Sequence, residues 1–466
     1  MPLVAGVDSS TSACKVEIRD ADTGRLVASG RAPHPPTTPP RSEQDPRAWA
    51  DAFDAAWAQA GADRSNRPAA VAIAGQQHGL VVTGADGTPL RPAKLWNDTE
   101  SAIDAEELVA ALGAEAWAAA CGSVPVPSFT ITKLRWLRRN EPDVYRRVAR
   151  IQLPHDWLTA RLTGRPTTDR GDASGTGWWS PAEERYRIDL LELVDPDVDW
   201  LPRLPTVLGP VEAAGEWDGI VVGPGTGDNM AAALGLGLTP GDLALSLGTS
   251  GTACTVSTTP TADPTGTVAG FADATGRYLP LVCTLNATKV TDAVARLLGV
   301  DAAELDRIAS DASPGSGGVV LVPHLDGERT PNRPDATGTI TGVRSDVSRA
   351  QLARAAFEGV VCNLLAGAEH LDPCPRRIFL VGGGARSRTY RRVVADLSGT
   401  EVLVPVDEEL VARGAAVQAA ATLAGCPVDD VVGAWSLPAE VVEPDTSLDR
   451  GAIRQAYDRV AEGIDR

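Results

Sequence analysis

The start of the chain alternates short apolar runs with turn-forming residues, a pattern that is typical of a β-meander. Residues 3–7 are continuously apolar, residues 15–19 alternate between apolar and charged side chains, and an apolar run returns at residues 26–28. The acidic, hydroxyl-rich residues 8–12 separate the first two runs and predict a turn. We therefore expect three short strands at the N-terminus of the fold.

A helical period follows this meander. Asp45 and Pro46 match the N-cap and the first position of a helix, and Trp49, Phe53 and Trp57 recur on one of its faces. Strands and helices go on alternating, so the predicted class is α/β. The next strands are expected at residues 69–74 and 80–82.

A second meander is predicted near the middle of the chain. An apolar strand over residues 243–247, a turn of Gly, Ser and Thr over 248–251, and a return strand over 252–256 repeat the plan of the N-terminus. This indicates a weak internal repeat, with two halves built on one plan. The glycine-rich residues 223–228 precede it and are a candidate hinge.

The last third of the chain carries clear helix start signals. Ser348 begins a predicted helix to about residue 370, and Ser387 begins another through residue 397. Strands are expected at residues 378–381, running into three glycines, and at 402–404, and an amphipathic helix is expected at 450–464.

The length of the chain limits the number of domains, and its net charge limits the classes of partner. A chain of 466 residues suits two large domains or three small ones. Its net charge of −18 argues against nucleic-acid or anionic-membrane partners, which need a basic surface. It leaves room for an anionic small ligand, because backbone N–H groups freed by some of the 46 glycines can hold phosphate.

Targeting segments and structural metals are not expected. No apolar run reaches the ~20 residues of a membrane span, and the N-terminus has no signal-peptide pattern. The seven cysteines are scattered without a C-x-x-C pair, which predicts reduced thiols in a cytoplasmic protein and makes a zinc site improbable.

Three turns are candidates for nucleotide binding. Neither a P-loop nor a G-x-G-x-x-G fingerprint is present. Instead, residues 8–12, 248–251 and 382–384 each form a small turn at a strand end. A single such turn is usually only a tight turn. Two together could cradle the phosphates of one nucleotide, and the third could admit adenosine against bare backbone.

Two aspartates and one lysine are candidates for phosphoryl transfer. Asp8 and Asp228 each end an apolar or glycine-rich segment, where an aspartate is most often a turn former. Phosphoryl transfer needs a carboxylate for Mg²⁺ and a base for the acceptor hydroxyl, and one aspartate could serve each task. Lys15 is one of only four lysines and is either a phosphate ligand or a solvated surface residue.

A polyol site is indicated by two loop segments. Gln76, Gln77 and His78 form one, and Trp96, Asn97 and Asp98 form the other. Amides, an imidazole and a carboxylate pair with hydroxyl groups, and an indole can cover the C–H face of a sugar. A structural role is the alternative for His78 in particular.

Ten segments together resemble the FGGY family of carbohydrate kinases over essentially the whole chain, and within it they look most like the xylulokinase group. They are GVDSSTSACKVEI (6–18), SEQDPRAWADA (42–52), IAGQQHG (73–79), LRPAKLWND (90–98), VPSFTITKLRWLRRNEP (126–142), TGDNMAAALGLG (226–237), LSLGTSG (245–251), LDGERTPNRPDATGTITGV (325–343), ARAAFEGV (353–360) and VGGGARS (381–387).

The resemblance implies a two-domain fold of the actin, hexokinase and Hsp70 type, ribonuclease H-like, with a ligand cleft between the domains. The N-terminal domain would span residues 1–222 and bind sugar, and the C-terminal domain would span 223–444 and bind ATP. A C-terminal helix over 445–466 would pack on the first domain. The implied reaction is ATP- and Mg²⁺-dependent phosphorylation of a ketopentose, D-xylulose to D-xylulose 5-phosphate.

The resemblance also implies roles for individual residues. Asp228 would be the general base, and Asp8 and Asp228 would lie at the metal. Sugar contacts would come from Gln77, His78, Trp96, Asn97, Asp98 and Asn229. ATP contacts would come from Ser10, Thr11, Lys15, Gly248, Thr249, Ser250, Gly382, Gly383, Gly384 and Arg386.

Two positions depart from the family pattern and leave alternatives open. Ser10 stands where the first turn typically has glycine, and Gln77 stands where xylulokinases often have methionine. The sugar could therefore be another polyol, such as ribulose, gluconate or glycerol, and a non-catalytic sugar or nucleotide sensor is a further alternative. The expected partners are a small-molecule sugar and ATP, with no nucleic acid and no membrane. A homodimer is one of the states that the sequence allows.

Overall fold

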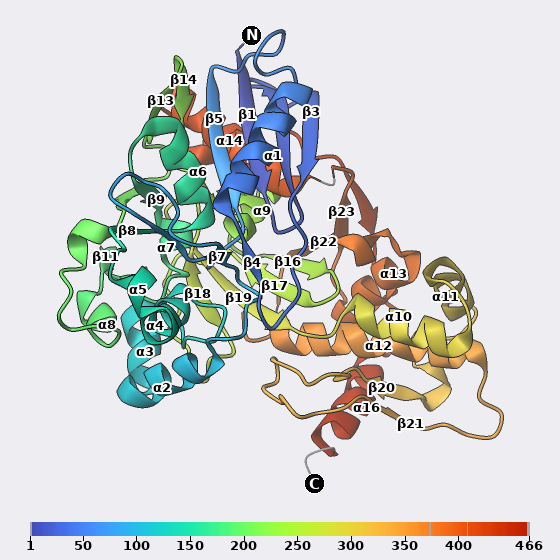
Figure 1. Cartoon of the computed structure of the whole chain (residues 1–466). Helices are drawn as coiled ribbons and strands as arrows, with labels where there is room; N and C mark the ends of the chain where they lie inside the picture. The colour runs from blue at the N-terminus through green and yellow to red at the C-terminus, as the bar shows by residue number, and fades with distance from the viewer. Residues whose placement is uncertain (1, 372–373, 408, 464–466) are drawn as a thin grey trace. The chain divides into compact units, whose positions relative to one another are not determined.

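The computed structural model of the chain describes residues 2–371, 374–407 and 409–463 (Figure 1). The chain forms two compact units. Unit 1 comprises Met1–Gly237, Ser257–Leu279 and Glu409–Ser436, and unit 2 comprises Leu238–Val256, Pro280–Glu408 and Leu437–Arg466. Each unit is built on a mixed β-sheet with helices packed against it, so the α/β class predicted from the sequence is confirmed.

The sheet of unit 1 contains the predicted N-terminal meander. Its strand order is β13-β14-β5-β1-β2-β3, with β15 beside the end of β5. Strands β1, β2 and β3 pair antiparallel, whereas β14, β15 and β1 run parallel to β5. The strands are β1 (Leu3–Ser9), β2 (Ala13–Asp20), β3 (Leu26–Pro33), β5 (Ala70–Gly75), β13 (Gly215–Trp217), β14 (Ile220–Val222) and β15 (Thr226–Gly227).

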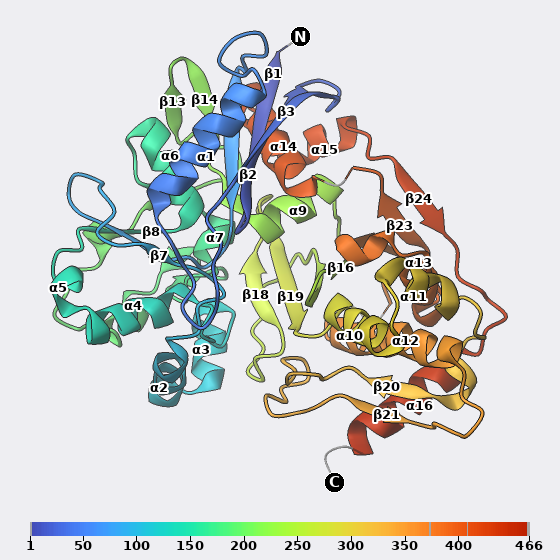
Figure 2. The same cartoon turned by 45° about the vertical axis from the view of Figure 1, so that its right-hand side comes forward.

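Two helices cover opposite faces of this sheet (Figures 1 and 2), α1 (Pro46–Gln59) and α14 (Leu410–Ala424). Asp45 caps α1 as predicted, because its side chain accepts a hydrogen bond from the backbone N–H of Arg47. Glycine lets both helices approach closely: a Cβ on Gly6 would lie 1.9 Å from the carbonyl oxygen of Ala412, which rules out a side chain there.

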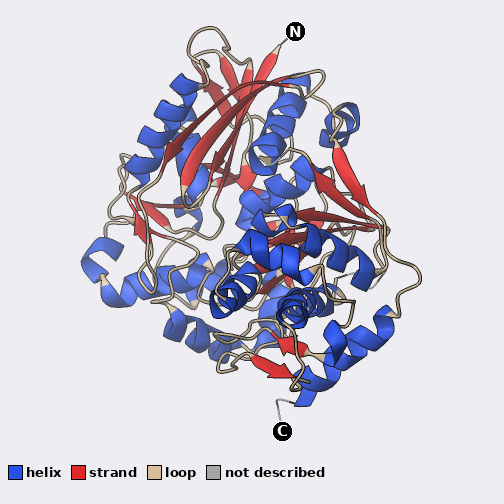
Figure 3. Ribbon diagram, turned by 90° about the vertical axis from the view of Figure 1, so that its right-hand side faces the viewer, coloured by secondary structure: helices blue, strands red, loops and turns tan. Residues whose placement is uncertain are grey.

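Figure 3 shows the helices of the chain in blue and its strands in red. The remaining elements of unit 1 are short strands and helices. The strands are β4 (Glu43–Gln44) with β7 (Ala93–Lys94), β6 (Val81–Thr83) with β8 (Arg150–Gln152), β9 (Thr167–Asp169) with β12 (Thr206–Leu208), β10 (Trp179–Ser180) with β11 (Arg185–Tyr186), and β18 (Ala269–Ala272). The helices are α2 (Ala102–Leu112), α3 (Ala114–Cys121), α4 (Thr130–Asn140), α5 (Pro142–Tyr145), α6 (Pro154–Thr163), α7 (Arg170–Ala173), α8 (Ile188–Glu192), α9 (Asp228–Leu236), α15 (Val428–Ala434) and the 3₁₀ turn η1 (Leu201–Arg203).

The sheet of unit 2 repeats the strand plan of unit 1. Its strands follow one another in the order β19, β17, β16, β22, β23, β24. The antiparallel ladder β19-β17-β16 with β22 parallel to β16 matches β3-β2-β1 with β5 parallel to β1, which confirms the predicted internal repeat. The strands are β16 (Asp242–Leu247), β17 (Gly251–Thr255), β19 (Tyr278–Thr284), β22 (Arg377–Val381), β23 (Val402–Pro405) and β24 (Ala439–Val442).

The helices of unit 2 begin where their caps predict. Ser348 and Gln351 form a reciprocal capping box at α12, and the Ser387 hydroxyl accepts a hydrogen bond from the N–H of Tyr390 at α13. The elements are α10 (Thr288–Leu298), α11 (Ala302–Ala309), α12 (Arg349–Ala368), α13 (Arg388–Ser398), α16 (Arg450–Gly463), the 3₁₀ turns η2 (Ser316–Gly318) and η3 (Gly383–Arg386), and the strand pair β20 (Val320–Val322) with β21 (Thr339–Thr341).

The division into units differs from the expected boundary at residue 222. Residues 223–237 stay in unit 1 because α9 packs on α14, which returns to the first sheet. A Cβ on Gly414 would lie 1.8 Å from the carbonyl oxygen of Ala231, so the two helix backbones touch at this glycine. Of the candidate hinge residues, 223–225 lie outside any helix or strand, Thr226 and Gly227 form β15, and Asp228 is the first residue of α9.

The C-terminal helix also differs from its expected position. The described part of it, α16, packs on α12, α13 and β20 of unit 2 rather than on unit 1. Tyr457 is buried in the core of unit 2 and its hydroxyl donates to the side-chain oxygen of Asn363 at 3.2 Å, while Arg454 pairs with Glu369 at 2.6 Å. Residues 464–466 lie outside the described residues.

Two further expectations from composition can be compared with the structure. Among the described residues, no helix is both long and apolar enough to cross a bilayer. Four of the seven cysteines are buried thiols outside any disulfide: Cys14, Cys121, Cys254 and Cys362.

Candidate active site

Strand register in unit 1 gathers candidate residues at one edge of the sheet. Asp8 of β1 and Thr226 of β15 both lie opposite Ala74 of β5, on its two sides. Parallel strands bring their carboxyl ends to the same edge, where open α/β sheets bind ligands. This edge of the sheet therefore carries three polar side chains: Asp8, Gln76, which follows β5, and Asp228, which follows β15.

Asp8 is a buried carboxylate at this edge, with 3% of its surface exposed. Its Oδ2 lies 3.4 Å from the Nζ of Lys15, and its Oδ1 has no hydrogen-bond partner among the described residues. Burial raises the pKa of Asp8 to about 6, although the charge of Lys15 opposes the rise. A buried carboxylate oxygen without a donor is suited to a cation.

Asp228 is the first residue of α9, and its Oδ1 accepts the backbone N–H of Asn229 at 2.8 Å. Burial, together with the negative charges of Asp8 and Asp172, raises the pKa of Asp228 to about 7. The two candidate aspartates are thus close enough to repel each other. A carboxylate with a pKa near neutrality is matched to accepting a proton from a hydroxyl group.

The turn between β1 and β2 is closed by its own hydroxyl. The Ser10 Oγ donates to the carbonyl oxygen of Ala13 at 3.0 Å. The Thr11 Oγ1 donates to the Oε1 of Gln76 at 3.0 Å and accepts the indole N–H of Trp96 at 2.9 Å. The turn is therefore tied directly to both predicted sugar segments.

Lys15 lies between two carboxylates. Its Nζ is 2.6 Å from the Oε2 of Glu409, at the start of α14, and 3.4 Å from Asp8. Burial acts to lower the pKa of Lys15, but these two carboxylates outweigh it and raise the pKa above its usual value. Lys15 is thus a cation at the edge of the sheet, and the alternative of a solvated surface lysine is wrong.

Gln77 and Asn229 form an amide pair beside Asp228. The Asn229 Nδ2 donates to the Oε1 of Gln77 at 2.6 Å and to the Oδ1 of Asp228 at 3.1 Å. The Nε2 of Gln77 is buried and finds no acceptor within the described part of the chain. This leaves one amide donor for a ligand hydroxyl.

His78 is held in a strained and specific orientation. It is one of four non-glycine residues with positive φ among those the structure describes, at 64°. Its Nδ1 donates to the carbonyl oxygen of Gly175 at 2.8 Å, and its ring stacks on Phe129 at 5.0 Å between centroids. Strain of this kind persists only where the surroundings enforce it, which favours a ligand-binding role over a merely structural one.

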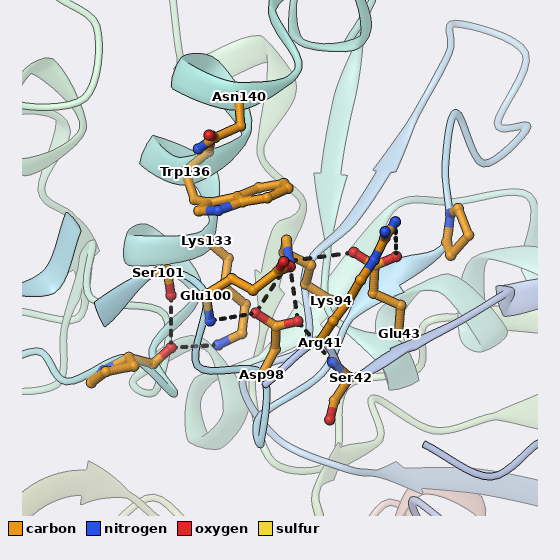
Figure 4. A network of polar contacts seen from close by, with 12 residues as sticks. Arg41, Ser42, Glu43, Lys94, Asp98, Glu100, Ser101, Lys133, Trp136 and Asn140 are labelled. Carbon is orange, nitrogen blue, oxygen red and sulfur yellow. Dashed lines mark hydrogen bonds and ion pairs between the residues drawn. The ribbon is translucent and has the colours of Figure 1, made fainter. Parts of the chain in front are cut away.

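Trp96 contacts the turn after β1 through Thr11, whereas the carboxylate of Asp98 is occupied by Lys94. The Trp96 side chain is 45% exposed, and the side-chain oxygen of Asn97 is buried without a donor among the described residues. Asp98 is fully buried, and both its carboxylate oxygens lie 3.1 Å from the Nζ of Lys94 (Figure 4). A direct contact between Asp98 and a sugar is therefore wrong for this structure, because Lys94 occupies its carboxylate.

A buried charged cluster lies next to Asp228. His155 is fully buried, with Nδ1 2.8 Å from Asp172 and Nε2 3.2 Å from Asp156 and 3.7 Å from Asp169. Burial disfavours the charged imidazole, but the three carboxylates outweigh it and raise the pKa of His155 to about 9. The cluster therefore contains an imidazolium at neutral pH.

In unit 2, the turn between β16 and β17 is held against the start of α10. The backbone N–H groups of Ala287 and Thr288 donate to the carbonyl oxygens of Thr249 and Gly248 at 3.1 and 2.9 Å. The N–H of Gly248 donates to the carbonyl of Ser250 at 3.0 Å. This turn occupies the same place in its sheet as the turn after β1.

The glycines after β22 border a cavity of about 430 Å³. Gly382 has φ of 85°, and a Cβ there would lie 2.8 Å from the carbonyl oxygen of Leu247, so glycine is required. Gly383 and Gly384 line the cavity, and a Cβ on Gly383 would meet nothing within 4 Å. The other lining side chains include Thr288, Thr291, Asp292, Phe357, Arg386 and Tyr390.

Some residues of these groups gave no signal in the sequence. Glu409 pairs with Lys15 across 394 positions, so no local pattern could reveal it. Gln44 donates to the carbonyl oxygen of Thr11 at 2.9 Å, and Thr291 and Tyr390 line the cavity through helix positions that resemble ordinary core. Of these residues, only Gln44 lies in a segment that resembles the family, residues 42–52, so only Gln44 could have been found from the sequence.

A resident metal site of three or more ligands is not formed at Asp8 and Asp228. Over the described ranges, the one group of three carboxylates that could hold an ion is Glu43, Asp98 and Glu100, and the Lys94 ammonium already lies between them. Two carboxylates are nevertheless sufficient for a Mg²⁺ ion that also binds substrate phosphates and water.

Comparison with known proteins matches both halves of the chain to one family. A family model of the N-terminal domain of the FGGY family of carbohydrate kinases matches residues 3–235, and that of its C-terminal domain matches residues 243–423.

Similar individual proteins carry a common name. The xylulose kinase of Streptomyces coelicolor is 48% identical over 97% of this chain and 95% of its own length, and that of Streptomyces rubiginosus is 48% identical over 100% and 95%. Among solved structures, the xylulose kinase of Bifidobacterium adolescentis is 41% identical, with a TM-score of 0.87 and 99% of each chain covered.

Proposed function

The chain belongs to the FGGY family of carbohydrate kinases, whose fold its two α/β units share, and from that premise we propose that it phosphorylates D-xylulose to D-xylulose 5-phosphate. ATP is the phosphoryl donor of this family. The relatives named xylulose kinase, at 48% identity over nearly the full chain, support the ketopentose as acceptor.

We assign Asp228 as the general base, and the observation that carries this assignment is its place at the same sheet edge as the buried Asp8, close enough for the two carboxylates to repel each other. The terminal hydroxyl oxygen of the sugar attacks the γ-phosphorus and its proton passes to Asp228. The bond between the γ-phosphorus and the bridging oxygen breaks, and ADP leaves. Desolvation by burial, with the added repulsion of Asp8 and Asp172, raises the pKa of Asp228 to about 7, which supports proton transfer at neutral pH.

The sugar is assigned to the side chains around Asp228 in unit 1. The unpaired Nε2 of Gln77, the side-chain oxygen of Asn97 and the amide of Asn229 offer hydroxyl partners. His78 and the exposed indole of Trp96 cover the C–H surface. Asp98 is assigned an indirect role through Lys94.

Within unit 2, the nucleotide is assigned to the turn of Gly248, Thr249 and Ser250 and to the cavity. Within unit 1, Ser10, Thr11 and Lys15 are separate candidate phosphate contacts. Adenosine is assigned to the cavity along Gly382, Gly383, Gly384 and Arg386, where the absence of a side chain at residue 383 leaves room for a flat base.

Mg²⁺ is assigned to Asp8, with Asp228 nearby. The unpartnered Oδ1 of Asp8 supports this choice. When bound, the ion would neutralise charge on the phosphates. We also assign the enzyme to the reducing cytoplasm, in keeping with its four buried thiols outside any disulfide.

A coupled assay of ADP release across D-xylulose, ribulose, gluconate and glycerol tests the proposal. We expect the highest kcat/KM for D-xylulose. If kcat/KM is at least tenfold higher for another polyol, that polyol is the acceptor instead of D-xylulose. We would then assign the difference in specificity to Gln77. Binding of ATP and sugar by calorimetry without any product would instead identify a sensor.

A further inference from the structure

Lys94 is a wholly buried lysine surrounded by three carboxylates (Figure 4). Its Nζ lies 2.5 Å from Glu100, 3.1 Å from Asp98 and 3.3 Å from Glu43. The same ammonium lies over the ring of Trp136, 3.7 Å from its centroid. A buried ammonium is costly unless it is paired in this way, so the arrangement is a built site rather than a chance contact.

Lys94 is the cation that the three carboxylates share. Their ligand oxygens are within 4.8 Å of one another, close enough for a metal ion. Glu43 has further partners in Arg91 and Arg41, whereas within the described part of the chain Asp98 has only backbone donors besides Lys94, including the N–H of Ser42 at 2.9 Å. Without the ammonium, Glu43 would keep its arginines, but the buried Asp98 would lose its cation and face the negative charge of Glu100.

The ion pair between Lys94 and Asp98 closes the base of a tight turn. The backbone N–H of Asp98 donates to the carbonyl oxygen of Leu95 at 3.1 Å, so Trp96 and Asn97 form the tip of this turn. From the tip, the indole of Trp96 donates to the Thr11 Oγ1. The charged cluster thus fixes the two side chains that the turn presents.

A second connection runs through β4. Glu43 pairs in register with Lys94, and the neighbouring Gln44 donates to the carbonyl oxygens of Thr11 and Pro35 at 2.9 and 2.6 Å. The Oε1 of Gln44 also accepts the Nε2 of Gln76 at 3.5 Å. The cluster therefore supports the Thr11 turn from two directions.

We propose that Lys94 is a positioning residue for the sugar, which acts by holding the 95–98 turn closed so that Trp96 and Asn97 face the acceptor. This inference rests on the proposed sugar site. It assigns Asp98 and Glu100 to the support of Lys94 and not to substrate contact.

The first test is Lys94→Met, which keeps the apolar stem and removes the charge. We expect the KM for D-xylulose to rise at least tenfold, because Asp98 is released and the turn opens. The kcat at saturating sugar and the KM for ATP should stay within threefold. The matched control is Arg19→Met, which removes another buried cation, paired with Glu17 at 2.7 Å at the far end of β2. The control should lower stability without changing the KM for the sugar.

A double-mutant cycle with Trp96→Phe distinguishes positioning from general loosening. A phenylalanine at position 96 cannot donate the hydrogen bond to Thr11, so opening the turn in this variant should raise the sugar KM little further. We expect the double variant to raise the sugar KM no further than the larger single variant, within twofold. Fully multiplicative effects would overturn the inference.

If Lys94→Met does not fold, Asp98→Asn is the variant that tests the inference. The amide oxygen can still accept the N–H of Ser42, and Lys94 keeps two carboxylates. A threefold or greater rise in sugar KM supports the inference, whereas an unchanged KM in either folded variant refutes it. Failure of the proposed function looks different, because the wild-type chain would then prefer another polyol to D-xylulose or phosphorylate no sugar at all.

Discussion

The replacement Asp228→Asn separates the chemistry of the candidate base from the structure that holds it. The amide oxygen of Asn can still accept the backbone N–H of Asn229, which Asp228 now accepts at 2.8 Å. The first turn of α9 should therefore remain intact. What is lost is the ability to take a proton from the acceptor hydroxyl.

The size of the effect follows from that single loss. General-base catalysis contributes about 10²–10⁴-fold in rate, or roughly 3–5 kcal/mol of barrier. Removing the charge also relieves the repulsion by Asp8 and the burial that together raise the pKa of Asp228 to about 7. The variant should therefore be at least as stable as the wild type at pH 8, and on the order of 1–4 kcal/mol more stable.

Three measurements test this reasoning together. The kcat for sugar phosphorylation should fall at least 100-fold, ATP should still bind in calorimetry, and thermal unfolding without nucleotide should not move to lower temperature. Asp143→Asn is the control, since it removes an exposed charge from the first turn of α5 in the same unit. A variant with kcat within threefold of wild type would refute the base assignment, and a loss of stability would show that Asp228 is structural.

Two further predictions concern the cavity and the buried histidine. At Gly383 a Cβ meets nothing within 4 Å, so Gly383→Phe should fold normally, raise the KM for ATP at least tenfold and leave the sugar KM unchanged. An unchanged KM for ATP in this variant would show that adenosine does not bind in this cavity. Gly382 has φ of 85°, so Gly382→Ala should lower the free energy of unfolding by roughly 1 kcal/mol or more. His155 has a pKa raised from 6.5 to about 9, so its stabilising contribution is complete below pH 6.5 and is lost as the pH rises through 9. Urea unfolding at pH 6.5 and 9.5 should show a loss in the free energy of unfolding that is up to about 3 kcal/mol larger in the wild type than in His155→Gln, because carboxylates such as Asp228 titrate in both proteins. Equal losses in both would contradict the raised pKa of His155.

Much of the local structure could be predicted because its causes are local. Asp45 before Pro46 and Ser348 before Gln351 satisfy the first N–H groups of their helices wherever those helices pack, and both caps are present. The two meanders were visible as apolar runs around hydroxyl-rich turns, and the sheets confirm their shared plan. The resemblance to the family rested on the same segments, whereas the shared sheet edge of Asp8 and Asp228 is seen only in the strand register.

Other features could not be predicted because they depend on residues that are distant in the chain. Asp98 belongs to a family segment, yet a buried ammonium takes its carboxylate, and no spacing in the sequence shows that Lys94 turns inward. The pairing of Lys15 with Glu409 needs the return of α14 to the first sheet. That return and the packing of α16 on unit 2 also set the boundary between the units.

The sequence by itself therefore determined the α/β class, the repeated meander, the helix starts and the chemistry available at each strand end. These depend on periodicity, capping and turn geometry, which act over a few residues. The tertiary structure alone decided which charged groups are buried and which partner each one finds. Burial makes an unpaired charge costly, so the partner decides whether a carboxylate such as that of Asp228 is left for a ligand or, like that of Asp98, is occupied by the fold itself.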